Sequence, residues 1–69
     1  MKMQSVSSST IASVGYDEEN KTLRIEFHSG RSYEYYKVPK FVYEGLLNAD
    51  SVGTYFHRNI KDAYDFSEV

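Results

Sequence analysis

Apolar and polar residues alternate with a period of two along the first half of the chain. Segments 11–16 and 22–27 both show this pattern, which is typical of a strand with one buried face. A tyrosine-rich segment, 31–38, follows the next turn and continues the alternation up to Tyr35. The pattern predicts three strands whose shared apolar face consists of Ala12, Val14, Tyr16, Leu23, Ile25, Phe27, Tyr33 and Tyr35, with Ile11, Ser13 and Gly15 on the other face.

Two short turns set the expected register of these strands. Residues 28–30 fit a three-residue hairpin loop in which Gly30 takes a positive φ. In the turn at 17–21, Asn20 is the residue that tolerates a left-handed conformation. The predicted cross-strand pairs are Val14–Ile25, Tyr16–Leu23, Phe27–Arg31, Ile25–Tyr33, Leu23–Tyr35 and, on the outer face, Arg24–Glu34. Tyr36 breaks the alternation, so it lies on the outer face unless a bulge re-aims it.

After Pro39 the apolar residues recur at helical spacing. Val38-Pro39 is expected to end the third strand, with Pro39 at the first helical position. A first helix over 40–48 is expected to end at Asn48 as its cap, and Asp50 or Ser51 caps a second helix. The expected apolar positions are Val42, Tyr43, Leu46 and Leu47, then Val52, Tyr55, Phe56 and Ile60.

The two ends of the chain carry weaker signals. Residues 1–9 are rich in serine and read as a leader, in which Ser8 and Ser9 either close the start of the first strand or are solvated. Residues 62–69 are acidic and are expected to fray, after Tyr64 and Phe66 dock on the edge of the core. The predicted fold is therefore α+β: a three-stranded antiparallel meander followed by two short α-helices packed on its apolar face. We expect a single domain over 1–69, with its core over about 6–64.

The composition indicates how so short a domain fills its core and which cellular compartment it suits. The chain has 69 residues, 11 of them aromatic (seven Tyr and four Phe), and large rings can fill the core of so short a domain. The absence of cysteine favours a reducing cytoplasm. No apolar run has the length of a signal peptide core or a membrane span, so a membrane partner is not expected.

Charge is unevenly spread along the chain. Residues 1–19 contain one base and three acids, residues 20–61 seven bases and four acids, and residues 62–69 three acids. The basic middle could bind an anion locally, although the net charge of −2 is far from that of strongly basic nucleic-acid binders. The simpler interpretation is an ordinary solvated surface.

The order of these signals resembles the KTSC domain. The matching pieces are S-S-x-I at 8–11, G-Y-D at 15–17, L-x-I-x-F at 23–27, G-x-x-Y-x-Y at 30–35, V-P at 38–39, L-L-x-A-x-S-x-G-x-Y-F at 46–56 and I-x-x-x-Y at 60–64. The Y-x-Y centre, Tyr33-Glu34-Tyr35, is the hallmark of that family. The resemblance implies a small domain found at the C-terminus of some lysyl-tRNA synthetases and as stand-alone bacterial proteins, with RNA binding suggested by the synthetase context.

Two functional hypotheses follow. In the first, RNA is bound by Tyr36 as a stacking ring, by basic side chains, and by free N–H groups at the start of the second helix. The residues assigned to this role are Tyr36, Lys37, Lys40, Ser51, Gly53, His57, Arg58 and Lys61. In the second, the chain is a protein-interaction module that binds itself or another protein through a sheet edge or an aromatic patch. Tyr33 and Tyr35 could form a base-stacking platform together with Tyr36, but the simpler interpretation makes them core residues, because they share a face with the apolar residues of 23–27.

The sequence gives little support for catalysis. It contains no G-x-S-x-G elbow, no glycine-rich phosphate loop and no close His/carboxylate cluster. With no cysteine, a metal site is also unsupported. We therefore expect a binding module that is not an enzyme and needs no cofactor.

Overall fold

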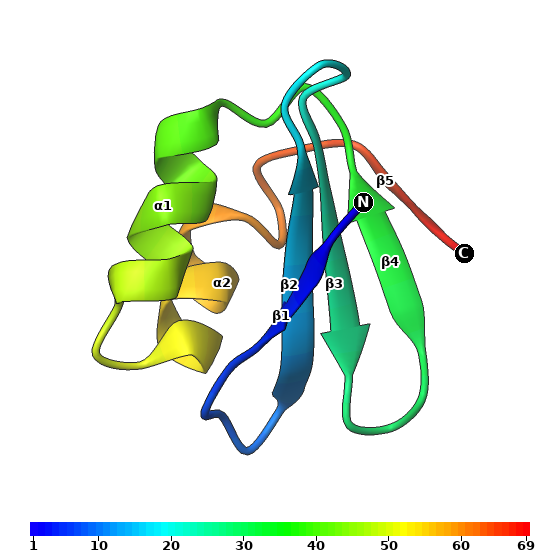
Figure 1. Cartoon of the computed structure of the whole chain (residues 1–69). Coiled ribbons are helices and arrows are strands. Elements are labelled where there is room, and N and C mark those ends of the chain that lie inside the picture. The colour runs from blue at the N-terminus through cyan, green and yellow to red at the C-terminus, as the bar shows by residue number, and fades with distance from the viewer.

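A single antiparallel sheet with two helices on one of its faces forms the structure, a computed structural model that describes all residues 1–69 (Figure 1). The five strands follow one another in sequence order across the sheet. The elements are β1 (Met3–Ser5), β2 (Ile11–Asp17), β3 (Thr22–Phe27), β4 (Ser32–Tyr35), α1 (Lys40–Asn48), α2 (Val52–Asn59) and β5 (Phe66–Glu68). The α+β class, the antiparallel sheet and the two helices agree with the sequence-based prediction, but the sheet has five strands where three were predicted.

The register of the central strands is the predicted one. Ile25 lies opposite Tyr33 and Leu23 opposite Tyr35, and the β2–β3 hairpin pairs Tyr16 with Leu23. The loop after β3 has three residues: the Phe27 N–H donates to the Arg31 carbonyl at 2.9 Å, and Gly30 has a φ of 96°. On the outer face, Arg24 Nε donates to Glu34 Oε2 at 3.1 Å, so the predicted ion pair also forms.

Two local details of these strands differ from the prediction. The positive φ of the first turn falls on Lys21 (52°) and not on Asn20, whose backbone and side-chain N–H groups donate to Asp17. Ile11 is fully buried and does not lie on the outer face. A register shift between Ile11 and Ser13 inserts one extra residue, and such a bulge turns the side chain of Ile11 to the helix-covered face.

The N-terminal residues form a strand, which corrects the prediction of a leader. β1 pairs with β2 so that Met3 lies opposite Gly15. A Cβ built on Gly15 would approach Met3 Sδ to 2.5 Å, so the missing side chain makes room for this strand. Ser8 closes the turn into β2, since its Oγ accepts hydrogen bonds from the N–H groups of Thr10 and Ile11.

The C-terminal residues also form a strand and do not fray. β5 pairs with β4, with Phe66 opposite Tyr35 and Glu68 opposite Tyr33. Backbone hydrogen bonds from Tyr36 N–H to the Asp65 carbonyl and from Val69 N–H to the Ser32 carbonyl frame this pairing. The strand is short and polar apart from Phe66, which is why its sequence gave no strand signal.

Both helices lie where the apolar spacing placed them, but their caps differ in part. Pro39 is the N-cap of α1 and not its first helical residue. Asn48 is still helical, and its side-chain amide donates to the Glu44 carbonyl, so Ala49 follows as the C-cap. For α2, Ser51 is the cap among the two candidates, because its Oγ accepts from the Thr54 N–H at 3.3 Å.

Eleven buried apolar residues join the helices to the sheet: Ile11, Val14, Leu23, Ile25, Tyr35, Val38, Val42, Leu46, Val52, Phe56 and Ile60. At one end of this core, Tyr16 stacks on Tyr43 of α1 with ring centroids 5.2 Å apart, and its hydroxyl donates to the Val38 carbonyl. No helix has the length and apolar character needed to cross a bilayer.

Candidate nucleic-acid interface

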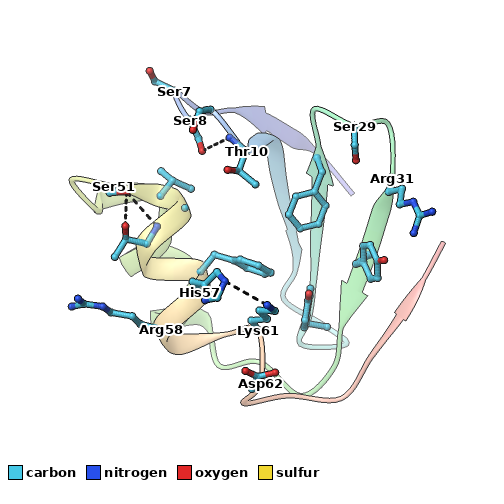
Figure 2. A pocket seen from close by; sticks show the side chains of 18 of the residues that line it. Ser7, Ser8, Thr10, Ser29, Arg31, Ser51, His57, Arg58, Lys61 and Asp62 are labelled. Atoms are coloured by element: carbon cyan, nitrogen blue, oxygen red, sulfur yellow. Dashed lines mark hydrogen bonds between the residues drawn. The ribbon is translucent and has the colours of Figure 1, made fainter.

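A groove of about 1040 Å³ opens between α2 and the β3–β4 part of the sheet. Figure 2 shows α2 along one wall, β4 along the other, the 7–10 segment at one end and Asp62 at the opposite end. The helix packs on the sheet through Phe56, so the sheet face beyond that ring is left partly uncovered. The groove is therefore a direct consequence of two short helices covering a sheet that two additional strands have widened.

Basic side chains occupy the helical wall. His57 and Lys61 lie one turn apart and point toward the groove, with Lys61 Nζ 3.4 Å from His57 Nε2 (Figure 2). Arg58 also borders the groove, but its side chain extends away from it in Figure 2. All three are exposed, as expected for the polar face of α2.

Hydroxyl groups gather where the start of α2 meets the N-terminal segment. Ser51 and Ser8 are both held in place by hydrogen bonds to backbone N–H groups, and His28 Nε2 donates to the Ser8 carbonyl at 2.8 Å. A Cβ on Gly53 would lie 3.6 Å from Ser8 Oγ, an ordinary contact distance. The protein itself therefore leaves room for a side chain at Gly53.

Aromatic rings form the floor of the groove. Tyr35 is 4% exposed, while Tyr33 is half-buried. Phe27 packs edge-on against Tyr33 and Phe56, with centroid distances of 5.7 and 5.6 Å. Phe66 of β5 lies against both tyrosines yet remains 52% exposed. The floor thus combines a buried, rigid base with one ring that is open to solvent.

The sheet wall contributes one further cation, Arg31. Its side chain is 67% exposed and lies 4.0 Å from Glu68 of β5. The neighbouring Tyr33 side chain, and then the Glu68 carboxylate, raise the pKa of the Arg31 guanidinium above its ordinary value. Arg31 is therefore a permanent positive charge on the sheet side of the groove, and in Figure 2 its side chain points away from α2, toward β5.

Most of the residues assigned to RNA binding from the sequence border either the groove or a second, smaller hollow, and Lys40 borders neither. Ser51, Gly53, His57, Arg58 and Lys61 all border the groove. Lys40 does not; its Nζ lies 3.2 Å from Glu18 Oε1 near the β2–β3 turn.

Tyr36 and Lys37 border a smaller hollow of about 280 Å³, formed with residues 62–65. Tyr36 lies on the outer face, one of the two positions considered, but its hydroxyl is hydrogen-bonded to Ser67 Oγ and its ring is half-buried. Lys37 adopts a left-handed φ of 58° as the chain leaves β4 for α1. The structure thus separates these two residues from the basic wall of α2.

Sequence reasoning missed two members of the groove, Arg31 and Phe66. Arg31 was used only to set the hairpin register, although its position at the start of β4 places it beside the Y-x-Y segment. Phe66 was expected to dock on the edge of the core, as it does against Tyr33 and Tyr35, but its place in a strand beside the groove was missed because the pairing of β5 with β4 has no local signal. The signal that could have identified it is the aromatic pair Tyr33 and Tyr35, which needs a partner on its open side.

The groove also contains acidic groups. Asp50 and Asp62 border it, against the permanent cations Arg31, Arg58 and Lys61, so its lining has a small positive excess. No group of three or more His, Asp or Glu side chains is arranged to bind a metal ion. The arrangement suits an anionic, ring-containing ligand better than a metal.

Comparison with known proteins identifies the family. The KTSC domain model matches residues 7–64. A lysine–tRNA ligase of Nostoc punctiforme is 44% identical over 61 residues, which cover 88% of this chain and 11% of the ligase. An uncharacterised protein of Stutzerimonas stutzeri is also 44% identical over 61 residues, and there the match covers 86% of the relative.

The fold agrees with an experimental structure. The crystal structure of a KTSC domain protein from Yersinia pestis superposes with a TM-score of 0.96 at 35% sequence identity, covering 99% of this chain and 96% of that one. The family thus includes both stand-alone small proteins and a region of much longer tRNA ligases, of which this chain spans about a tenth. On sequence and on structure, the chain belongs to the KTSC domain family.

Proposed function

We propose that this chain is a small RNA-binding module that holds a single strand in the groove between α2 and the sheet. The observation that carries the proposal is the groove's composition, with basic side chains on both walls and aromatic rings on its floor. Lys and Arg bind phosphates, and unpaired bases stack on aromatic rings. The groove therefore offers both kinds of contact that a single RNA strand uses.

The relatives support an RNA ligand. The same domain forms part of proteins named lysine–tRNA ligase, which take a tRNA as substrate by name. In the stand-alone relative the match covers 86% of the protein, which leaves little room for a ligase part. The RNA bound by this chain therefore need not be that tRNA. What the two groups share with this chain is the domain.

The magnitude of the salt effect follows from the charges. Three permanent cations border the groove: Arg31, Arg58 and Lys61. The Arg58 side chain extends away from the groove, so if Arg31 and Lys61 each neutralise one phosphate, log K falls with log[salt] at a slope of about −1.4 for a single strand, or roughly 7-fold between 50 and 200 mM salt. Asp50 and Asp62 keep the absolute affinity modest.

The test is fluorescence anisotropy with a pool of short, labelled single-stranded RNAs at 50 and 200 mM salt. We expect the Lys61→Gln variant to bind more weakly and to lower the salt slope by about 0.7. Lys21→Gln is the matched control, because Lys21 lies in the β2–β3 turn and does not border the groove. Absence of binding at 50 mM salt, or binding that salt does not weaken, would refute the proposal.

A protein-interaction module is the second candidate, and the edge of the sheet favours it. The hydrogen bonds that frame β5 leave the backbone groups of Phe66 and Glu68 pointing away from β4. Such an edge can add a strand from a second copy or from another protein. A mass that rises with concentration in sedimentation velocity would support self-association, whereas a monomer at every concentration would count against it.

A further inference from the structure

We infer that Phe66 is a stacking subsite for one unpaired base, an inference that rests on the proposed RNA-binding function. Phe66 is the large apolar residue that is both exposed, at 52%, and part of the groove. The other strongly exposed phenylalanine, Phe41 at 70%, lies on α1 outside the groove. The exposed ring of Phe66 therefore lies in the same groove as the basic side chains, whereas the exposed ring of Phe41 does not.

The ring of Phe66 is supported from behind. Its centroid lies 5.4 Å from Tyr35 at an interplanar angle of 32° and 5.7 Å from Tyr33 at 53°. Tyr35 is itself clamped edge-on by Phe56, with centroids 5.6 Å apart. A ring backed in this way loses little conformational freedom when a base stacks on its open side, which favours binding.

The charges next to Phe66 suit the backbone of the same nucleotide strand. Arg31 is joined to β5 through Glu68, two residues beyond Phe66, and lies on the sheet side of the groove. His57 of α2 and Lys61, which follows the end of that helix, face the groove from the helical side (Figure 2). A strand with one base on Phe66 would therefore run between Arg31 beside β5 and Lys61 just after the end of α2.

This geometry selects unpaired nucleotides. In a duplex the faces of the bases are stacked on their neighbours and cannot reach a protein ring, whereas a loop or a single strand can present one base face. Stacking alone does not read the 2′-hydroxyl, so the subsite itself accepts RNA or DNA. The recognised chemistry is an unpaired base flanked by phosphates.

The experiment uses a short single-stranded RNA that carries one 2-aminopurine, whose fluorescence reports stacking, together with anisotropy for affinity. Phe66→Leu keeps an apolar side chain against Tyr33 and Tyr35 but removes the aromatic face. Phe66→Trp keeps an aromatic face at the same position. We expect Phe66→Leu to weaken binding by about 5- to 150-fold and to abolish the wild-type change in 2-aminopurine signal. Phe66→Trp should retain both the affinity and the change in 2-aminopurine signal. The control Phe41→Ala should leave the Kd within about twofold of the wild-type value.

The outcomes separate the subsite from the function on which it rests. If wild type binds the RNA but Phe66→Leu binds like Phe41→Ala, the stacking subsite is refuted and the RNA-binding proposal stands. If wild type binds no nucleic acid at low salt, both fail; self-association that Phe66→Leu abolishes would then assign the ring to a protein partner. Parallel titrations with DNA of the same sequence and with a duplex separate the possible ligands: an equal Phe66 dependence for the duplex would overturn selection of unpaired bases.

Discussion

The same substitution, Gly→Ala, is expected to have opposite effects on the two helices. Alanine favours a helix interior over glycine by about 1 kcal/mol, so helix propensity alone predicts that both variants are more stable. At Gly53, the second residue of α2, part of this gain is available, because a Cβ meets only Ser8 Oγ at 3.6 Å. At Gly45 a Cβ would come within 2.8 Å of Tyr55 Cζ, and closer still to its hydroxyl oxygen.

The overlap between a Cβ at Gly45 and the Tyr55 ring decides whether Gly45→Ala raises or lowers the free energy of unfolding. The Tyr55 ring packs partly buried between the helices, so it must shift to admit a Cβ, and overpacking of this kind costs about 1–3 kcal/mol. Subtracting the helical gain leaves Gly45→Ala destabilised by roughly 1 kcal/mol, whereas Gly53→Ala gains up to about 1 kcal/mol. For a domain of this size, 1 kcal/mol corresponds to a change in Tm of about 4–8 °C.

A double-mutant cycle isolates the contact. We expect Gly45→Ala to become stabilising when it is introduced into a Tyr55→Ala background, where the obstructing ring is gone. Urea unfolding followed by circular dichroism gives the four free energies of unfolding. A Gly45→Ala variant that is more stable than wild type, with Tyr55 intact, would show that the ring moves aside at no cost and would refute the reasoning.

Three further predictions concern stability. Leu46→Ala, which truncates a fully buried side chain, should cost about 2–5 kcal/mol and leave little folded protein in a thermal melt. Gly30→Ala should cost about 1–2 kcal/mol in urea unfolding, because φ is 96° there although a Cβ would meet no other atom; an unchanged midpoint would contradict this. Burial, with smaller contributions from Tyr33 and Asp62, raises the pKa of Tyr35 above its usual 10.0, so the folded state holds this proton more tightly than the unfolded state does. The protonated Tyr35 hydroxyl therefore contributes to the free energy of unfolding in full below pH 10, and this contribution is lost as the pH rises through the pKa of the folded state. Replacing the residue in Tyr35→Phe should make the decline in Tm above pH 10 less steep.

The central hairpins were predictable because each register choice has a large consequence. A two-residue loop after β3 would have put Tyr33 opposite Glu26, whereas the three-residue loop keeps every apolar residue on one face, as the structure shows. The helices were predictable because Val42, Leu46, Val52 and Phe56 recur at helical spacing. In both cases the burial of apolar side chains selects a single arrangement.

The edge strands and the groove were not predictable in the same way. The segments Met3–Ser5 and Phe66–Glu68 are short and mostly polar, and they form strands because a neighbouring strand offers unpaired hydrogen-bonding groups. The groove needs α2, β4, β5 and the 7–10 segment together, so its existence depends on tertiary packing. The sequence suggested the basic wall, but it could not show that Arg31 and Phe66 lie across from it.

The sequential order of the strands also bears on how the chain folds and opens. The β2–β3 and β3–β4 pairings join neighbouring segments, so they can form early at little cost in loop closure. The β4–β5 pairing instead joins segments separated by both helices, so it costs more in loop closure and is expected to form later. β1 and β5 are each held by one neighbour only, so these edge strands are the parts of the sheet expected to open most readily without global unfolding, and β5 is the one that borders the groove. Each opening of β5 would uncover Tyr33 and Tyr35, so the accessible aromatic surface of the groove fluctuates with the docking of three residues.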